Sequence, residues 1–389
     1  MDSVMNKIEV IIVGGDHHNG LGLARIFGLN NIVVHAVIID KTKKAFLSYS
    51  KYVRDCFVIK SEKDAFDFIL EKYIPNNDKK YIIIPYSDGA AYELDNRLDE
   101  FSGYIKPSIN NTQGALAKMM LKNEQYTFAK ENEIKMAYTS IVQMAKDYKE
   151  TISTVPYPCI IKPLISSEGD KKDIRICSDS TSLEKAIKEY ESKGYSRALL
   201  QEYLTIDYEI DVFGCILKQA PYICQIPTKT IRAWPAKGGT NSFSQIITDA
   251  QIVEKCKEII KKLANAGFYG LYDIELFVID GDIWLNEINY RNSGDVYMGI
   301  EQKYYYPLAW VQDCLGIKVD ISSSPMQNSY AMTECADLRN VIKGHVNIFT
   351  WIKEFIACKD YALKFKGDMH PAYKQYMHYI KQFFKGKKM

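Results

Sequence analysis

Charged and amide side chains gather around a predicted turn at residues 280–282. Two apolar-rich stretches flank this Asp-Gly-Asp turn, which predicts an antiparallel hairpin. Because side chains alternate between the two faces of a strand, Glu287, Asn289 and Arg291 share one face. A three-residue turn pairs Glu275 with Glu287 and adds it to that face, whereas a two-residue turn places it on the opposite face. We therefore expect a turn with an odd number of residues.

The chemistry of this predicted face is that of a cation and phosphates. Two neighbouring carboxylates repel each other unless a cation lies between them. Hard oxygen donors beside an arginine are typical of a site where Mg²⁺ holds phosphates. The alternative is a solvated polar face without a chemical role. The combination of residue types favours the metal and phosphate interpretation.

Two lysines are candidates for binding the phosphates. Lys122 lies in a stretch with a helical pattern, 114–132, and Lys162 lies near the end of a short apolar strand, 156–163. A lysine in an apolar strand must either reach solvent or meet an anion. The polar loop at 166–172 follows and is suited to covering a phosphate, although any hairpin loop could have this composition.

A second predicted loop, 228–244, carries two cations. It contains Arg232, Lys237 and the pair Gly238-Gly239. Cations next to hinge glycines are suited to closing over an anionic site. The alternative is an ordinary surface loop.

The N-terminal residues predict a β-α-β unit and hence a parallel sheet. Apolar strands at 7–13 and 33–39 flank a glycine-rich turn and a helical run. Asp40 follows the second strand and invites a dinucleotide interpretation, but Gly14, Gly20 and Gly22 do not have the Gly-x-Gly-x-x-Gly spacing. The turn could instead bind a substrate carboxylate at the helix N-terminus.

Polar residues also follow the predicted strand 81–84. Ligands of open α/β sheets lie beyond the carboxyl ends of the strands, so Ser87 and Asp88 are candidate substrate contacts. Both are also good helix N-caps, and one residue can serve both purposes. The adjacent pair His17-His18 is interpreted as part of a polar loop, with a ligand role as the alternative.

Length and composition bound the remaining possibilities. A chain of 389 residues predicts two or three domains, and a net charge of +2 gives no electrostatic case for nucleic acid. No apolar run approaches the roughly 20 residues of a transmembrane helix. Nine scattered cysteines without a Cys-x-x-Cys pair predict reduced thiols in the cytoplasm, not disulfides or a zinc site.

The tail from about residue 327 predicts two helices with apolar stripes. One spans 346–357 and the other spans about 373–384. The last segment, 372–389, is basic and aromatic. Such a stripe more often packs on its own protein, and weak contact with an anionic membrane surface is the alternative.

These segments, in this order, resemble the ATP-grasp superfamily of carboxylate–amine ligases over most of residues 7–325. The hairpin is the most specific part of the resemblance, with Glu287 twelve residues after Glu275 and then Asn289 and Arg291 at steps of two. The resemblance implies that Glu275, Glu287 and Asn289 hold one or two Mg²⁺ ions, with Mn²⁺ as a substitute. It implies that Arg291 steadies the oxygens of the transferred phosphate.

The same resemblance assigns the nucleotide contacts. Lys122 and Lys162 are similar to the two lysines that contact ATP phosphates. The segment Glu202-Tyr203-Leu204 resembles the hinge that contacts adenine, and Glu209 matches the acid that holds the ribose hydroxyls. Two departures are a polar loop with one glycine, Gly169, and Leu121 before Lys122 where many relatives have Asp.

The implied fold is α/β, with α+β lobes in the ATP-grasp part. A Rossmann-like domain at 1–112 precedes an ATP-grasp domain at 113–326, whose flexible lobe is about 113–198 and whose metal-bearing lobe is about 199–326. A helical extension, 327–389, follows. The N-terminal half resembles the D-aspartate-ligase-type and carbamoyl-phosphate-synthase-like group, and the tail resembles relatives in surface-polymer biosynthesis.

The implied function is ATP-dependent formation of an amide. A carboxylate attacks the γ-phosphate of ATP to give an acyl phosphate, which an amine then attacks. We expect Arg232 and Lys237 to help neutralise the acyl phosphate, small-molecule carboxylate and amine substrates, and a homodimer. The alternatives are an ATP-grasp carboxylase or thiol ligase, a nucleotide-binding protein without turnover, and a dinucleotide oxidoreductase.

Overall fold

The computed structural model describes residues 7–42, 45–144, 148–164, 173–218, 223–236, 238–319 and 328–384. Contacts divide the chain into two compact units. The larger unit comprises Met1–Lys118, Ile210–Ile274 and Ile288–Met389, and the smaller unit comprises Met119–Glu209 and Glu275–Glu287. This division differs from the three domains expected from the sequence, whose boundaries at 112 and 326 stay a prediction.

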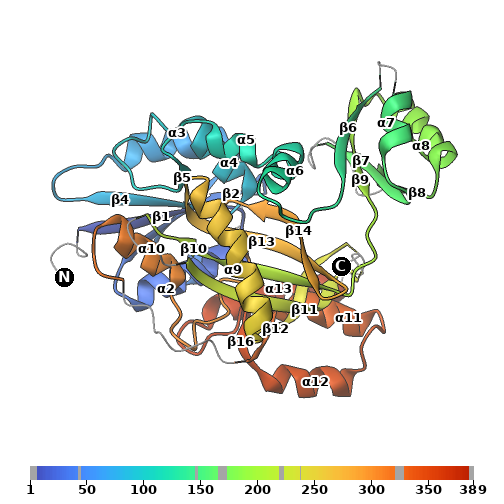
Figure 1. Cartoon of the computed structure of the whole chain (residues 1–389). Coiled ribbons are helices and arrows are strands. Elements are labelled where there is room, and N and C mark those ends of the chain that lie inside the picture. The colour runs from blue at the N-terminus through green and yellow to red at the C-terminus, as the bar shows by residue number, and fades with distance from the viewer. Residues whose placement is uncertain are drawn as a thin grey trace. The chain divides into compact units, whose positions relative to one another are not determined.

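The larger unit begins with a parallel four-stranded sheet in the order β3-β2-β1-β4 (Figure 1). All three neighbouring pairs are parallel. Every residue of β1 is buried, as expected for a central parallel strand covered on both faces. The parallel sheet predicted from the N-terminal sequence is confirmed. The strands are β1 (Ile8–Gly14), β2 (Val33–Ile39), β3 (Val53–Ile59) and β4 (Lys80–Pro85).

Alternate residues of β1 enter two different cores. Val10 and Ile12 pack in the core that includes Leu23 and Phe27 of α2. Ile11 and Val13 pack in a second core, with the apolar residues of α3 and α4. This alternation covers both faces of the sheet with helices. The elements are α2 (His18–Leu29), the 3₁₀ helix η1 (Phe46–Tyr49), α3 (Glu62–Lys72) and α4 (Asp88–Asn96).

A second, mixed sheet has the order β14-β13-β10-β11-β12-β15-β16, with β5 paired to β13. Apolar side chains of β10, β11 and β12 enter the same core as α2, so this sheet and the N-terminal sheet share one core in the larger unit. The strands are β5 (Ser108–Ile109), β10 (Tyr208–Ile216), β11 (Ile223–Trp234), β12 (Thr240–Ile246), β13 (Phe268–Ile279), β14 (Asp282–Asn289), β15 (Tyr330–Met332) and β16 (Cys358–Tyr361).

The other helices outside the smaller unit are α5 (Ala115–Met119), α9 (Ala250–Asn265), α10 (Tyr306–Cys314), α11 (Glu334–Ile342), α12 (Ile348–Ala357) and α13 (His370–Phe384). Trp310 of α10 is fully buried in the shared core. The C-terminal extension contains the two expected helices, α12 and α13, and in addition α11 and two short strands, β15 and β16, which join the mixed sheet.

The smaller unit contains an antiparallel sheet in the order β6-β9-β7-β8. Figure 1 shows α7 and α8 together on one side of this sheet. Their apolar residues form one core with alternate residues of β7 and β9. The elements are α6 (Lys122–Glu131), β6 (Thr139–Gln143), α7 (Lys149–Thr154), β7 (Cys159–Pro163), β8 (Arg175–Cys177), α8 (Ser180–Ser192) and β9 (Arg197–Glu202).

Two predicted segments differ from the structure. The helical stretch 114–132 is two helices, α5 and α6, because Leu121 has an extended backbone (φ −75°, ψ 132°) and begins a new helix. Most of the predicted loop 228–244 is strand, since β11 ends at Trp234 and β12 begins at Thr240. All nine cysteines are free, as predicted. In the described part of the chain, no helix combines the length and the apolar composition needed to cross a membrane.

A buried ion pair ties the C-terminal extension to α2. Arg25 is 1% exposed, and its Nε lies 3.3 Å from Asp368 Oδ2. Its Nη2 donates to the carbonyl oxygens of Leu363 (2.6 Å) and Asp368 (3.1 Å). Asp368 also accepts from Ser50 Oγ at 2.7 Å. One buried guanidinium thus satisfies several acceptors of the extension at once.

Replacement of Arg25 by Ala should destabilise the protein strongly. The variant leaves a buried carboxylate without its cation, which costs about 3–5 kcal/mol. The midpoint of denaturant unfolding, followed by circular dichroism of the full chain, measures this loss. The control is Lys261→Ala, because Lys261 lies in an exposed pair with Glu254 and should change stability by less than about 1 kcal/mol. Equal midpoints for the two variants would contradict the assignment.

Candidate active site

The turn of the β13–β14 hairpin has two residues. β13 ends at Ile279 and β14 begins at Asp282, and the two turn residues have positive φ, 50° at Asp280 and 76° at Gly281. Two-residue hairpin turns with positive φ match the twist of the strands, and Asp-Gly provides them at low cost. The prediction of an odd-numbered turn is therefore wrong. Counting back from the turn places Glu275 opposite Asn286, and Asn286 Nδ2 donates to Glu275 Oε2 at 2.9 Å.

One face of the sheet in the smaller unit carries polar groups. Cys159 and Ile161 of β7 point into the core with α8, so Lys162 lies on the opposite face. There its Nζ donates to Gln201 Oε1 at 2.9 Å. Gln201 Nε2 in turn donates to Thr139 Oγ1 at 3.4 Å. The apolar packing of one face thus fixes the lysine on the other.

Lys162 is influenced by charges of both signs. Burial and the positive charge of Lys122 lower the pKa of Lys162 from 10.5 to about 8, while Glu287 and Glu275 act in the opposite direction. Lys122 Nζ lies 2.6 Å from Glu287 Oε2. Two lysines and two glutamates therefore interact electrostatically within the smaller unit, as the sequence pattern suggested, although strand alternation alone does not bring Glu275 and Glu287 together.

The oxygen donors on the hairpin fit a hard cation that also has other ligands. Among the described residues, no group of three or more His, Cys, Asp and Glu side chains is arranged to hold a metal ion. Mg²⁺ is typically bound by one or two carboxylates together with substrate phosphates. Two carboxylates of the hairpin, those of Glu275 and Glu287, are of the required type, and Asn289, which is 7% exposed, follows Glu287 on β14. The site thus fits Mg²⁺ only with phosphate oxygens present.

The residues expected to bind the nucleoside lie around β9 and β10. Glu202 Oε2 accepts from the backbone N–H of Tyr138 at 3.3 Å, and the Tyr203 N–H donates to Pro158 O at 2.9 Å. Leu204 is half-buried, and Tyr203 is 42% exposed. Desolvation raises the pKa of Glu209, the residue expected to hold the ribose hydroxyls.

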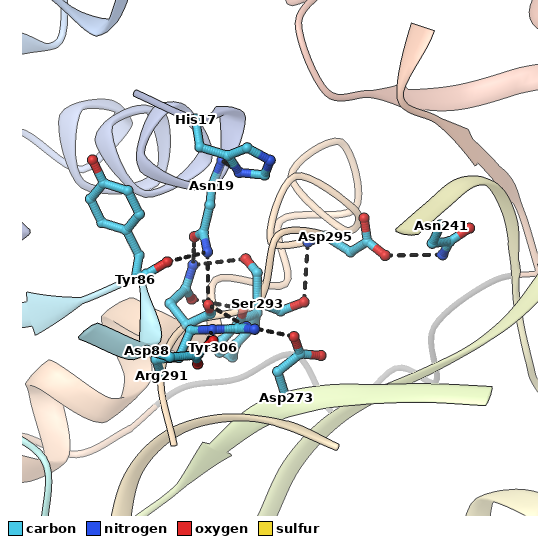
Figure 2. A network of polar contacts seen from close by, with 11 residues as sticks. His17, Asn19, Tyr86, Asp88, Asn241, Asp273, Arg291, Ser293, Asp295 and Tyr306 are labelled. Atoms are coloured by element: carbon cyan, nitrogen blue, oxygen red, sulfur yellow. Dashed lines mark hydrogen bonds and ion pairs between the residues drawn. The ribbon is translucent and has the colours of Figure 1, made fainter. Parts of the chain in front are cut away.

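In the larger unit, Arg291 lies between two carboxylates (Figure 2). Its Nε is 3.0 Å from Asp88 Oδ1, and its Nη1 is 2.7 Å from Asp273 Oδ2. Asp88 begins α4 after β4, and Ser87 caps the same helix by accepting from the Ala90 N–H at 3.4 Å. Ser87 therefore serves as the cap that the sequence allowed, and Asp88 contacts the guanidinium expected to steady phosphate oxygens.

The segment after Arg291 is fixed by buried amides. Asn19 Nδ2 donates to Tyr86 O at 3.1 Å and to Asn292 O at 2.8 Å, and the Asn292 amide donates back to Asn19. Tyr306 Oη donates to Asn292 Oδ1 at 2.9 Å. Figure 2 shows this network joining the start of α2, the end of β4 and the turn after β14. The position of Arg291 is thereby set by contacts on both sides.

Two titratable groups next to this network have shifted pKa values. Desolvation and the positive charge of Arg291 lower the pKa of His17 to about 4, and His17 Nδ1 accepts from the Asn19 N–H at 3.3 Å. Burial and the nearby charge of Asp273 raise the pKa of Asp295 to about 7. Asn241 Nδ2 donates to Asp295 at 3.1 Å. A carboxyl group that titrates near neutrality is suited to proton transfer.

Arg232 has partners other than those expected. It is a strand residue in β11, and its Nε and Nη2 lie 3.0 and 2.7 Å from the two oxygens of Asp337, which is fully buried. Its Nη2 also lies 2.8 Å from Glu354. Moving Arg232 to an acyl phosphate would leave a buried carboxylate unpaired. The structure therefore gives Arg232 a role in holding α11 and α12. Lys237 and the loop at 166–172 lie outside the described residues.

Comparison with known families identifies the part of the chain that carries Lys162 and the two carboxylates. A family model of the ATP-grasp domain matches residues 127–302. The chain carries an ATP-grasp domain. The match includes β7 with Lys162, β9, the whole β13–β14 hairpin and Arg291. The predicted resemblance to the ATP-grasp superfamily is confirmed.

Similar proteins share this domain. Formate-dependent phosphoribosylglycinamide formyltransferase of Francisella tularensis subsp. tularensis is 23% identical over 297 residues, covering 74% of this chain and 71% of that enzyme. The same enzyme of Wolinella succinogenes is 23% identical over 292 residues, covering 74% and 70%. N5-carboxyaminoimidazole synthetase from Staphylococcus aureus, complexed with ADP, superposes with a TM-score of 0.65 at 15% identity and covers 87% of both chains. This likeness confirms the predicted mixed α/β fold.

Several residues of the site were missed from sequence alone. Asp273 and Asp295 flank the recognised hairpin residues, and Asn19 and Asn292 join segments 273 residues apart. Asp273 could have been found, because it lies two residues before Glu275 on the same strand face. The amide pair could not, since no local pattern indicates a contact over that separation.

Lys162 should titrate near pH 8 in the protein without nucleotide. Burial and Lys122 disfavour its charged form, so its pKa is lowered to about 8. Trace acylation of amines at a series of pH values, followed by mass spectrometry, gives the midpoint for each lysine. Lys63 is the control, because Asp67 raises its pKa. The Lys122→Met variant should move the Lys162 midpoint upward. A Lys162 midpoint at or above that of Lys63 would refute the assignment.

Proposed function

We propose that this protein is an ATP-dependent ligase that activates a carboxylate as an acyl phosphate and couples it to an amine. The observation that carries the proposal is the set of two lysines and two glutamates in the smaller unit, where Lys122 pairs with Glu287 and burial lowers the pKa of Lys162. These are the charges that phosphoryl transfer needs, because that reaction depends on positioning and charge neutralisation.

Lys122 and Lys162 are proposed to bind the phosphates of ATP. Lys162 has a low pKa, and an anionic ligand would favour its charged form. A triphosphate would also compete with Glu287 for Lys122, which frees that carboxylate. Glu202, Tyr203 and Leu204 are proposed to contact adenine, and Glu209 the ribose. The ADP complex of the similar Staphylococcus aureus synthetase supports a nucleotide in this fold.

Glu275, Glu287 and Asn289 are proposed to hold one or two Mg²⁺ ions, with Mn²⁺ as a substitute. These three residues would hold the ion through their oxygen atoms, and the chemistry it would supply is neutralisation of negative charge on the phosphates. The carboxylates of Glu275 and Glu287 lie near Lys122 and Lys162. The hydrogen bond from Asn286 Nδ2 orients the carboxylate of Glu275.

Arg291 is proposed to contact the transferred phosphate. Its guanidinium already lies in a fixed position between Asp88 and Asp273, so little conformational entropy is lost when it meets an anion. Asp88 is 58% exposed on its side chain and is the partner that a phosphate can replace. Asp273, with 13% exposure, keeps holding the arginine.

The amine is proposed to bind in the larger unit near Arg291, among His17, Asp88 and Asp295. An attacking amine must be neutral, and it loses a proton as the amide forms. Asp295, with a pKa of about 7, can accept that proton near neutral pH. Ser87 and Lys237 are further substrate contacts expected from the sequence. The names of the similar enzymes refer to phosphoribosylglycinamide and carboxyaminoimidazole ribonucleotide, so a polymer-linked amine finds no support and is not proposed.

Carboxylation is the second candidate reaction. Several similar structures are N5-carboxyaminoimidazole synthetases, which favours it over a thiol acceptor. ADP release measured over a panel of carboxylates, including formate and bicarbonate, each combined with a set of amines, separates the two. Dependence on bicarbonate and an added carboxyl group in the product would identify the carboxylase.

The chain is proposed to divide into three parts. Residues 1–112 are proposed as the Rossmann-like part, 113–326 as the ATP-grasp part with its two lobes, and 327–389 as the C-terminal extension. A cytoplasmic location and a homodimer are proposed with it. Nine free cysteines are consistent with a reducing compartment.

Glu275→Gln and Glu287→Gln should each abolish ADP release while leaving the fold intact. Both carboxylates serve the proposed metal and the lysines and do not pack in a core, so the amide variants should fold normally. Turnover in the presence of Mg²⁺ and circular dichroism give the two readouts. Glu131→Gln is the matched control, because Glu131 is an exposed acid in the same unit. Near-normal turnover in either site variant would show that the metal assignment is wrong.

Arg291→Met should lower kcat with little effect on ATP affinity. The variant removes a donor from the transferred phosphate, a loss that costs about 10²–10³ in rate at comparable sites. ATP affinity should persist because the proposed phosphate lysines remain. Steady-state kinetics and nucleotide titration measure the two quantities, and Arg54→Met, at an exposed arginine, is the control. A larger effect on ATP affinity than on kcat would contradict this role.

A further inference from the structure

The outer face of α12 is apolar and open to solvent. No residue of this helix is buried. Phe349 is 72% exposed and Ile356, seven residues later on the same side of the helix, is 75% exposed. Ile348 and Ile352 add 41% and 43% exposure. Ten residues of helix thus present four large apolar side chains to water, more than isolated exposed apolar residues account for.

The opposite face of α12 is anchored to the protein. Trp351 Nε1 donates to Asp337 Oδ2 at 3.0 Å, and Glu354 pairs with Arg232 at 2.8 Å. Trp351 stacks on Phe355, with ring centroids 5.1 Å apart, and Phe355 contacts Tyr361. These contacts fix the orientation of the helix. The apolar stripe is therefore a stable feature of the surface.

The charge around this stripe has one sign. Residues 343–389 contain ten lysines, no arginine and three acids, a formal charge of +7. The whole chain carries +2, so the preceding 342 residues carry −5. All seven lysines between 343 and 381 are exposed. The segment is therefore a basic surface on a chain that is otherwise slightly acidic.

The three acids of this segment are directed inward. Asp360 is 2% exposed and Asp368 is 4% exposed. Glu354 is paired with Arg232. None of the three is exposed, so none offsets the lysines on the surface. Between 342 and 359 every exposed charged side chain is basic, namely Lys343, Lys353 and Lys359.

A small pocket lies directly after α12 in the chain. It has a volume of about 180 Å³, and Lys359, Lys364 and Lys366 line it together with Glu301 and Asp360. Lys364 Nζ also lies 5.3 Å from the centre of the Phe355 ring of α12, so the pocket and the helix are adjacent. Three lysines at one opening favour an anionic group, such as the phosphate of a lipid headgroup.

We propose that α12 lies in the interface of a membrane that contains anionic lipids, with its apolar stripe among the acyl chains and the surrounding lysines on the headgroups. A helix with an apolar face and a lysine-rich border is typical of such binding. The surface lies on α12 and the following lysines, and not mainly on the 372–389 segment that the sequence singled out.

A second copy of the chain fits this face less well. In a symmetric dimer the same surface faces itself, so the lysines on one copy would approach those on the other. Exposed like charges at an interface oppose association, whereas an anionic membrane neutralises them. The positive charge of the segment therefore favours an anionic membrane over a second copy of the chain as the partner of this face.

Sedimentation of the full chain with vesicles tests the proposal. The protein should bind vesicles of equimolar phosphatidylcholine and phosphatidylglycerol, bind pure phosphatidylcholine weakly, and be released by high salt. The double variant Phe349→Glu/Ile356→Glu should bind at least about ten-fold more weakly. Lys353→Glu/Lys359→Glu should also weaken binding and reduce its dependence on salt.

Matched controls separate the surface from a general change in charge. Ile74 is 65% exposed outside the C-terminal extension, so Ile74→Glu should bind as the wild type does. Lys188→Glu, at an exposed position of α8, is the control for charge reversal. Equal losses in control and test variants would overturn the proposal, as would equal binding to neutral and anionic vesicles. Light scattering that shows a dimer dissolved by Phe349→Glu/Ile356→Glu, without vesicle binding, would identify the face as a dimer interface instead.

Discussion

Two ion pairs of Arg291 connect separate elements of the larger unit. Asp88 comes from the start of α4 and Asp273 from β13, so one guanidinium joins the two sheets at their polar edges. The buried amides of Asn19 and Asn292 fix the same junction from the other side. A charge held by two partners of different exposure can exchange one of them for a substrate anion without losing its position.

In the smaller unit, too, a ligand could replace an internal ion-pair partner of a charged side chain. Lys122 forms an ion pair with Glu287, and Lys162, whose pKa is lowered to about 8, loses its proton more readily than an ordinary lysine. The lysines and glutamates are thus compatible with each other when no phosphate is present. Phosphates would bind the lysines, and a divalent cation would bind the carboxylates. Because each ligand would release the partner group that the other one needs, the two should bind together more favourably than separately.

Local patterns predicted the N-terminal parallel sheet, the two helices of the tail and the β13–β14 hairpin, because buried strands and amphipathic helices leave short-range signals. The turn was mispredicted since Asp282 was counted as loop, although Asp280 and Gly281 alone supply the two positive φ angles. Arg232 was assigned to catalysis because its sequence neighbours are glycines and a lysine. Its partner Asp337 lies 105 residues away, and only the folded chain shows that contact.

Acidic side chains of the C-terminal extension are paired with cations, as Asp88 and Asp273 are paired with Arg291. Two acids of its basic segment are held by other parts of the protein: Glu354 by Arg232, and Asp368 by Arg25, Ser50 and the Lys51 N–H. The exposed charges of the described segment 343–381 are therefore those of its lysines. Burial of an unpaired acid would cost several kcal/mol, so attachment of the extension to the protein and the basic character of its surface have one physical cause. An apolar stripe on α12 then adds the second component that membrane binding needs.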